Sequence, residues 1–206
     1  MLPEKLLNTA IDHFGRFGFE GASTRAIAKA SGTAMSSITY HFGGKEGLYL
    51  AAADHIAACI TALQGERVAA ACAAGRASRD AAIQGVLGVL DGFALMMLSP
   101  EAAPWARFIT REQQYPTEAF DRLYNGAMRT LSEAMVELVS RARPDLPEAE
   151  AKATTILLFG QALVLRAGRA SVCRVMAVER IDDATAALLR ARLRANALCI
   201  LSETPQ

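Results

Sequence analysis

The sequence has few aromatic residues and little that favours β-structure. Aromatic residues make up 6% of the 206 positions, whereas apolar residues make up 52% and alanine recurs throughout. Runs of β-branched residues are scarce and no β-hairpin signal appears, so the hydrophobic pattern favours helices over strands. We therefore predict an all-α protein.

Paired cysteines and closely spaced histidines are also missing. The four cysteines, Cys59, Cys72, Cys173 and Cys199, are scattered along the chain, and no two of them have the spacing of a disulfide framework or a metal site. The three histidines, His13, His41 and His55, show no His-x-x-x-His or Glu-x-x-His pattern. The sequence therefore predicts core or surface thiols, no metal site and no cofactor.

A secretion signal and a membrane-spanning run are likewise not evident. Met1–Lys5 lacks the layout of a signal peptide, with its charged start and apolar core. The uncharged stretch Ala153–Leu165 contains Gln161, and Lys152 and Arg166 close it well short of the ~20 residues that a membrane-spanning helix needs. We expect a cytoplasmic protein that does not bind a membrane.

Sequence motifs of common enzymes are absent too. No Gly-x-Ser-x-Gly elbow or dinucleotide-binding glycine pattern occurs, and Gly43–Glu46 lacks the remaining residues of a phosphate-binding loop. We expect that the protein is not an enzyme, although a helical enzyme or ligand carrier whose site is assembled from distant residues stays an alternative.

The chain length suits one small and one medium domain, which we place at residues 1–48 and 49–206. Apolar periodicity, capping residues and proline breaks predict helices over residues 3–17, 24–31, 35–42, 45–63, 78–97, 104–114, 117–142, 148–170 and 182–201. A softer alanine-rich stretch is expected over residues 64–76.

Two short predicted helices, Thr24–Ser31 and Met35–Phe42, are joined by a three-residue turn that begins at Gly32. A tight helical corner of this kind is used to read DNA, because its second helix fits the major groove. Ile38 and Phe42 are four residues apart and can face the core. This leaves the solvent face of the second helix with Ser36, Ser37, Thr39 and Tyr40.

Hydroxyl groups on that face suit contacts with bases or phosphates. Phosphate contacts are expected at the amino ends of neighbouring helices, from Thr24, Arg25 and Lys45, with His41 as a further donor. Net charge alone would not suggest nucleic acid, because it is only +1. On spacing alone, an alternative is a purely structural corner in which Tyr40 and His41 are partly buried.

The order of residues over Phe14–Leu48 adds to this interpretation. It follows Phe-x-x-x-Gly-Phe-x-x-x-Ser-Thr-x-x-Ile-Ala, then Gly-x-x-x-x-x-Ile-x-Tyr-His-Phe-x-x-Lys-Glu-x-Leu, which resembles the DNA-binding domain of TetR-family regulators. The resemblance implies DNA contacts at Thr39, Tyr40, His41 and Lys45, with base-reading positions at Ser36 and Ser37. Departures from the family pattern are Ala34 at a common capping position, Gly44, and the lack of a basic arm before the first helix.

Segments over residues 106–124 and 160–166 resemble the CecR-like subgroup of the same family. A buried arginine or glutamine on an apolar helix needs a partner or a ligand, and effector pockets are mostly apolar with a few polar groups. The candidate ligand-binding residues are Phe108, Arg111, Tyr124, Met128, Gln161 and Arg166. The alternative is structural: Arg111 forms ion pairs with Glu112 or Asp121, and the methionines fill the core.

We therefore expect a ligand-responsive transcription regulator, and the resemblance implies that it is a repressor. A homodimer formed through the last two helices would place two reading helices roughly 34 to 36 Å apart on a palindromic operator in double-stranded DNA. The seam of the last helix is expected at Ala184, Leu188, Ala191, Ala195 and Leu198. A small-molecule effector would release the DNA. An architectural DNA-binding protein without a ligand is the remaining alternative.

Overall fold

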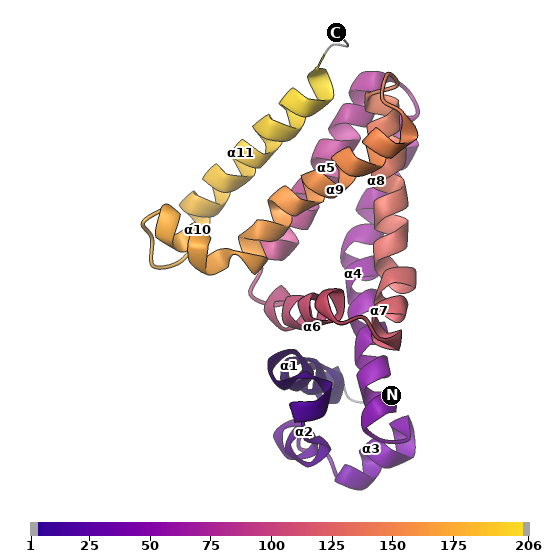
Figure 1. Cartoon of the computed structure of the whole chain (residues 1–206), viewed down its shortest axis with the longest axis vertical. Coiled ribbons are helices and arrows are strands. Elements are labelled where there is room, and N and C mark those ends of the chain that lie inside the picture. Colours follow the sequence, from indigo (N-terminus) through magenta and orange to yellow (C-terminus); the bar gives the residue numbers. More distant parts are fainter. Residues whose placement is uncertain (1–3, 204–206) are drawn as a thin grey trace. The chain divides into compact units, whose positions relative to one another are not determined.

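The computed structural model describes residues 4–203, and within them every regular element is a helix (Figure 1). The elements are α1 (Glu4–Gly21), α2 (Thr24–Ser31), α3 (Met35–Phe42), α4 (Lys45–Gly75), α5 (Arg79–Leu98), α6 (Ala102–Gln114), α7 (Glu118–Leu123), the π-helix η1 (Tyr124–Met128), α8 (Arg129–Ala142), α9 (Glu148–Ala167), α10 (Arg169–Val175) and α11 (Asp183–Ser202). The predicted all-α fold is confirmed. The expected helix start at Pro3 lies outside the described residues.

The helices form two compact units. The first contains the chain up to Thr61 together with Glu101–Arg129, and the second contains Ala62–Pro100 together with the chain from Thr130 on. Helix α4 begins in the first unit and ends in the second. The predicted boundary at residue 48 separates a DNA-binding part from a part that senses a ligand and dimerises. This boundary stays a prediction.

The first unit is built around α1, which packs against α2 and α6. Leu6, Ile11 and Phe14 recur on one face of α1 and are fully buried. Phe14 lies edge-to-face with Tyr49 of α4, with ring centroids 4.8 Å apart, and Tyr49 lies 4.7 Å from the ring of Phe108 on α6. These aromatic contacts tie α1, α4 and α6 into one core.

Helix α1 changes direction at Gly18, close to its predicted end at Phe17. Gly18 has φ 73° and ψ 178°, a conformation that favours glycine, and the amide of Ala22 then donates to the Gly18 carbonyl. The exit of α1 is therefore a separate last turn, which leads directly into α2.

The second unit is centred on α5, which packs against both α9 and α11 (Figure 1). Its inward residues Val86, Leu87 and Leu90 are at most 2% exposed. Ser78 caps α5, because its hydroxyl accepts a hydrogen bond from the amide of Ala81. Asp182 caps α11 in the same way, through the amide of Thr185.

Helix α4 is longer than predicted. It was expected to end near Leu63, yet it continues to Gly75 through a segment rich in alanine, the residue with the highest helix propensity. This extension is anchored in the second unit, where Val68 is buried and the side-chain amide of Gln64 donates to the carbonyl of Gly92. The softer stretch predicted at residues 64–76 is thus mainly helix.

Two predicted helices are each divided. The helix expected over residues 117–142 is interrupted by η1, where the amide of Arg129 donates to the carbonyl of Tyr124 in a wider turn. The helix expected to reach Ala170 ends at Ala167, and α10 follows at an angle of 83°. Hydrophobic periodicity does not distinguish a wide turn or a bend from a continuous helix, because both keep an apolar face.

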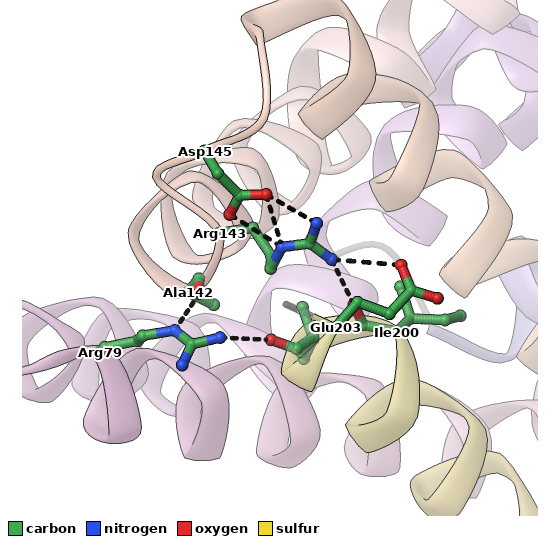
Figure 2. Close-up of polar contacts among 7 residues, drawn as sticks. Arg79, Ala142, Arg143, Asp145, Ile200 and Glu203 are labelled. Atoms are coloured by element: carbon green, nitrogen blue, oxygen red, sulfur yellow. Dashed lines mark hydrogen bonds and ion pairs between the residues drawn. The ribbon is translucent and has the colours of Figure 1, made fainter. Parts of the chain in front are cut away.

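Two arginines hold the carboxyl ends of α8 and α11 (Figure 2). Arg143 is 6% exposed; its Nη1 donates to the carbonyl of Ile200 at 2.7 Å, and its Nη2 lies 2.7 Å from Asp145. Arg79 donates to the carbonyls of Ala142 and Leu201. The last carbonyls of a helix have no partner within the helix, so these arginines supply the missing donors.

By length and hydropathy alone, α4 and α5 are apolar enough to cross a membrane, and α9 with α10 would add a third span if the bent pair were counted as one. The expectation above considered only Ala153–Leu165. The most apolar window of α5 is 61% buried inside the protein. Packing against α9 and α11 therefore accounts for much of the apolar character of α5.

Candidate DNA-binding site and sensor residues

The corner between α2 and α3 is fixed by its capping residues. The Ser23 hydroxyl accepts from the amide of Ala26, and Gly32 closes α2 in the left-handed conformation with φ 73°. The following amide, of Thr33, donates to the carbonyl of Ala28. Ala34 precedes α3 and makes no side-chain cap hydrogen bond, in line with the departure from the family pattern noted at this position.

Helix α3 is anchored on one face and open on the other. Ile38 is 1% exposed and fixes the helix to the core, whereas Phe42 is only half-buried. Four hydroxyl-bearing side chains of α3 are expected to face DNA. Ser36, Thr39 and Tyr40 are exposed, and Ser37 is half-buried. This arrangement can present short polar groups to a groove.

Tyr40 is the most prominent residue on that face. Its side chain is 84% exposed, and its ring lies edge-to-face with that of His41, with centroids 4.9 Å apart. His41 is exposed as well. The alternative of a structural corner with both rings partly buried is therefore wrong.

The residues expected to contact phosphates differ in whether their side chains already bind other parts of the protein. Arg25 is exposed and Thr24 half-buried at the amino end of α2. Lys45 instead donates to the carbonyl of Glu20 at 3.0 Å and lies 4.8 Å from the centroid of the Phe19 ring. An ammonium group has three donor hydrogens, so Lys45 can hold the end of α1 and still offer hydrogens to an anion.

Helix α6 contributes a buried acid, Glu112, whose contacts differ from the expected ion pair with Arg111. Glu112 is 1% exposed; its Oε1 accepts from the Tyr49 hydroxyl at 2.5 Å, and its Oε2 accepts from the amide and hydroxyl of Thr117 at 3.1 and 2.8 Å. Burial, the hydrogen bond with Glu112 and the charge of that carboxylate all raise the pKa of Tyr49. Tyr49 therefore stays a protonated donor.

Arg111 lies against the bend of α1. A Cβ atom at Gly18 would lie 2.7 Å from Nη1 of Arg111, so the guanidinium would have to shift, and φ 73° at this position favours glycine in any case. The Nε atom of Arg111 is buried and has no hydrogen-bond partner among the described residues. The ion pairs considered for Arg111, with Glu112 or Asp121, are not among the salt bridges of residues 4–203.

Helix α6 is also joined to α1 by an ion pair. The Nη2 atom of Arg107 lies 2.6 Å from Oδ1 of Asp12, which also pairs with Arg16 on its own helix. Arg107, Arg111 and Glu112 thus contact the helices that support the α2–α3 corner. These contacts could not be predicted from the sequence, because the partners are far apart in the chain.

The candidate sensor residues are divided between the two units. In the first, Phe108 is buried against Tyr49, Tyr124 is 42% exposed beside Phe120, and Met128 is half-buried. Tyr124 and Met128 are the two ends of η1, and π-helical turns occur often at functional sites.

In the second unit, Gln161 accepts a hydrogen bond from the side-chain amide of Asn196 at 3.3 Å. Arg166 donates to the carbonyl of Ser99. Met96 and Met97 are buried, as expected of residues that fill a core. Among the residues the structure describes, no group of three or more His, Cys, Asp or Glu side chains could hold a metal ion.

Comparison with known families connects this geometry to a function. Residues 6–52 match the family model of bacterial regulatory proteins of the tetR family. Residues 82–203, more than half of the chain, match the C-terminal domain of the HTH-type transcriptional dual regulator CecR. The chain belongs to the TetR family. It is a DNA-binding transcription regulator with a C-terminal domain of the CecR type, which confirms the resemblance seen in the sequence.

Individual relatives agree with this assignment. The dual regulator CecR of Shigella flexneri is 28% identical over 176 residues, which cover 82% of this chain and 77% of the relative. The regulatory protein RaaS of Mycobacterium tuberculosis is 45% identical over 53 residues, or 26% of this chain and 24% of the relative. These relatives and the matched family models are transcription regulators, and they indicate no catalytic family.

Solved structures show the same fold at low sequence identity. A TetR-family regulator from Mesorhizobium loti has a TM-score of 0.67 and 14% identity, over 96% of this chain and 94% of that one. FadR of Bacillus subtilis, solved in complex with stearoyl-CoA, has a TM-score of 0.63 and 14% identity, over 98% of both chains. The TetR-like fold, with an N-terminal helix-turn-helix and a larger helical C-terminal part, is thus confirmed.

Proposed function

We propose that this TetR-family protein is a repressor that binds a palindromic operator as a homodimer and is released by a small molecule. The observation that carries the proposal is the exposed face of α3, held outward by the buried Ile38. A helix anchored in this way can enter a major groove without unfolding its own core. The protein acts where its operator is, in the cytoplasm, through residues 1–48.

Base contacts come from Ser36, Ser37, Thr39 and Tyr40, and phosphate contacts from Thr24, Arg25, His41 and Lys45. Bases are read by direct hydrogen bonds or by contacts with methyl groups, and phosphates by cations and helix amino ends. Arg25 sits in the first turn of α2 and Lys45 in the first turn of α4, where the helix dipole favours an anion. Exposure of the α3 side chains supports this assignment.

An exposed apolar stripe supports assembly through α9 and α11. On α9, Ile156, Leu157, Leu163 and Val164 are 44 to 70% exposed and recur at helical spacing. On α11, the predicted seam is exposed at all five positions, Ala184, Leu188, Ala191, Ala195 and Leu198. Apolar side chains that gather in this way are typical of interaction surfaces, and an identical surface on a second copy gives a closed two-fold dimer.

The CecR-type domain is the proposed sensor, through Phe108, Arg111, Tyr124, Met128, Gln161 and Arg166. The buried Nε of Arg111 supports a ligand contact there, because a polar group without a partner is costly to bury. FadR, a transcriptional regulator of the same fold, has been solved in complex with stearoyl-CoA. An effector that prefers one conformer lowers the affinity for the operator.

A second candidate function is regulation in both directions. The CecR relative is named a dual regulator, and its similarity extends over 82% of this chain. Reporter genes distinguish the two functions when the gene for this protein is deleted. If the protein only represses, the deletion raises the expression of its targets. If it regulates in both directions, the deletion lowers the expression of at least one target.

Operator binding is tested with Thr39→Ala combined with Tyr40→Ala. A gel shift on the DNA upstream of its own gene should show a band that random DNA competes poorly at stated salt. We expect the double variant to lose roughly 30-fold in affinity, because a base contact contributes about 1–3 kcal/mol of discrimination. Tyr115→Ala is the matched control, since Tyr115 is 74% exposed in the same unit but outside α3.

Full binding by the Thr39, Tyr40 double variant would reject α3 as the reading helix. Equal competition by random DNA would remove specific regulation and leave an architectural DNA-binding protein. The two results differ, because the first concerns the variant and the second the natural sequence.

The dimer is tested with Ile156→Glu on α9. A charge in the centre of an apolar interface should raise the dimer dissociation constant at least about tenfold, since an unpaired buried charge is strongly unfavourable. Light scattering after size exclusion should then show a particle near the monomer mass of 22.0 kDa. Leu63→Glu, at a position that is 56% exposed on α4, should leave the dimer unchanged. A dimer that survives Ile156→Glu unaltered would place the interface elsewhere.

A further inference from the structure

A groove runs along α10 and the turn that follows it, within the second unit. Its volume is about 810 Å³. This short segment supplies both the basic and the small apolar side chains that line the groove. The lining residues are Arg169, Ala170, Cys173, Arg174, Ala177, Val178 and Glu179.

The two arginines of the groove have no acidic partner among residues 4–203. Neither Arg169 nor Arg174 belongs to a salt bridge between residues of the described range 4–203. Moreover, the Nη1 atom of Arg169 is buried and has no hydrogen-bond partner there. A guanidinium N–H that is removed from water without an acceptor costs free energy, which a bound oxygen atom would recover.

The floor of the groove is held in place by the backbone. Ala177 has φ 53°, in the left-handed region that residues other than glycine rarely adopt. The amide of the next residue, Val178, donates to the carbonyl of Cys173 at 3.0 Å, which closes the end of α10. The methyl groups of Ala177 and Val178 thereby lie at fixed places on the same short segment as both arginines.

We infer that this groove binds a small organic anion, a carboxylate or phosphate carried on an apolar body. Arginine matches either group, because its planar fork offers two parallel N–H donors. Ala170, Ala177 and Val178 suit the apolar body. Glu179 also lines the groove, and its carboxylate disfavours a ligand that carries a second negative charge near it. The site is separate from the sensor residues proposed above and does not depend on operator binding.

Cys173 provides a local measurement, because it lines the groove and all four cysteines are free thiols. The full chain is treated with iodoacetamide, and alkylation is measured for each cysteine by peptide mass spectrometry. We expect octanoate to slow the alkylation of Cys173 at least threefold. Cys199 is exposed on α11 and outside the groove, so its rate should not change. The neutral 1-octanol should not protect Cys173.

A second set of probes tests which anionic group the groove accepts and whether the apolar body is needed. Octyl phosphate that protects as well as octanoate shows that either head group is accepted. Protection by inorganic phosphate at the same concentration would show that the apolar body is unnecessary and would overturn that part of the inference. Sodium chloride at matched ionic strength controls for screening.

Arg169→Gln and Arg174→Gln test the role of the arginines. Each should raise the octanoate concentration needed for half-protection of Cys173 about tenfold, whereas Arg129→Gln, which removes one exposed positive charge in the other unit, should not. Unchanged protection in both groove variants would overturn the proposal. Cys173 protection that rises with protein concentration, without any probe, would instead make the groove a contact between copies and would overturn it as well.

Discussion

Replacing Glu112 with alanine is expected to lower the free energy of unfolding by about 3 kcal/mol. The Tyr49 hydroxyl, buried with its residue at 4% exposure, would lose its acceptor, and so would the amide and hydroxyl of Thr117. A hydrogen bond to a charged group contributes about 1.5–3 kcal/mol, and a buried donor left without an acceptor costs about 1–3 kcal/mol. Removal of the side chain also leaves a cavity between α4, α6 and α7.

The measurement is urea unfolding followed by the fluorescence of Trp105, the only tryptophan in the chain, which lies on α6 in the same unit. Glu112→Gln is the conservative variant, because it keeps the volume and one carbonyl oxygen for Tyr49. Its amide group then faces the Thr117 donors, so an intermediate loss is expected. An unfolding free energy within 0.5 kcal/mol of the natural protein for Glu112→Ala would contradict the role of this network.

A double-mutant cycle isolates the bond between α4 and α6. Tyr49→Phe removes only the hydroxyl that donates to Glu112. If this hydrogen bond carries stability, the losses in Tyr49→Phe and Glu112→Ala should not add, and a coupling of about 1–2 kcal/mol should remain. Strict additivity would mean that each residue acts independently. The bond links α6 to the helix that follows the α2–α3 corner, so operator affinity should fall together with stability.

The DNA-reading corner could be predicted from the sequence because it is a local structure. Ser23 as a cap, Gly32 as the turn and Ile38 as the anchor all lie within sixteen residues, and each has a conformational preference of its own. The order of these residues also carries the family resemblance. The structure adds the degree of exposure, above all of Tyr40, which spacing alone left open.

The supporting network could not be predicted, because its partners are distant in sequence. Glu112 and Tyr49 are 63 residues apart, and Lys45 is 25 residues from the Glu20 carbonyl to which it donates. Nothing in the local pattern distinguishes a glutamate that is buried and satisfied from one on a solvated face. The only signal in the sequence was the position of Glu112 next to Arg111 on a helix with an apolar stripe. That position is compatible with a buried glutamate and with a solvated one.

The middle of the chain shows a different limit. Alanine-rich residues continue α4 to Gly75, where a break was expected, because alanine favours a helix even without a strong amphipathic pattern. The π-turn at Tyr124–Met128 keeps the apolar face in register while it widens one turn. Periodicity therefore locates the apolar faces of these helices better than their ends.

Replacing Arg143 with alanine is expected to destabilise the second unit by about 3 kcal/mol. Arg143 is 6% exposed, and its guanidinium is the donor for the Ile200 carbonyl at the end of α11 and for both oxygens of Asp145 (Figure 2). A hydrogen bond to a charged group contributes about 1.5–3 kcal/mol, and the Ile200 carbonyl would lose its charged donor, whereas the exposed Asp145 would be rehydrated. Arg143→Lys should recover only part of this, because an ammonium group cannot form the parallel pair of hydrogen bonds.

Arg141 offers a matched control two residues earlier, in the last turn of α8. It forms an exposed pair with Glu137, and an i,i+4 pair on a helix surface contributes only about 0.3–0.5 kcal/mol. Urea unfolding followed by circular dichroism should therefore show a large loss for Arg143→Ala and almost none for Arg141→Ala. Equal effects of the two substitutions would mean that the buried contacts at the end of α11 add nothing beyond a surface charge.

The pH dependence of the same variants tests which interaction is responsible. The hydrogen bond from Arg143 is the main cause that lowers the pKa of Asp145 in the folded protein. Its stabilisation is thus complete above the unfolded pKa of about 4 and is lost as the pH falls through the lower folded value. The difference between the natural protein and Arg143→Ala should narrow in acid, whereas the part due to the Ile200 carbonyl should persist. A difference that stays constant from pH 7 to pH 3 would assign the whole effect to the carbonyl, and hence to the end of the helix that carries the proposed dimer face.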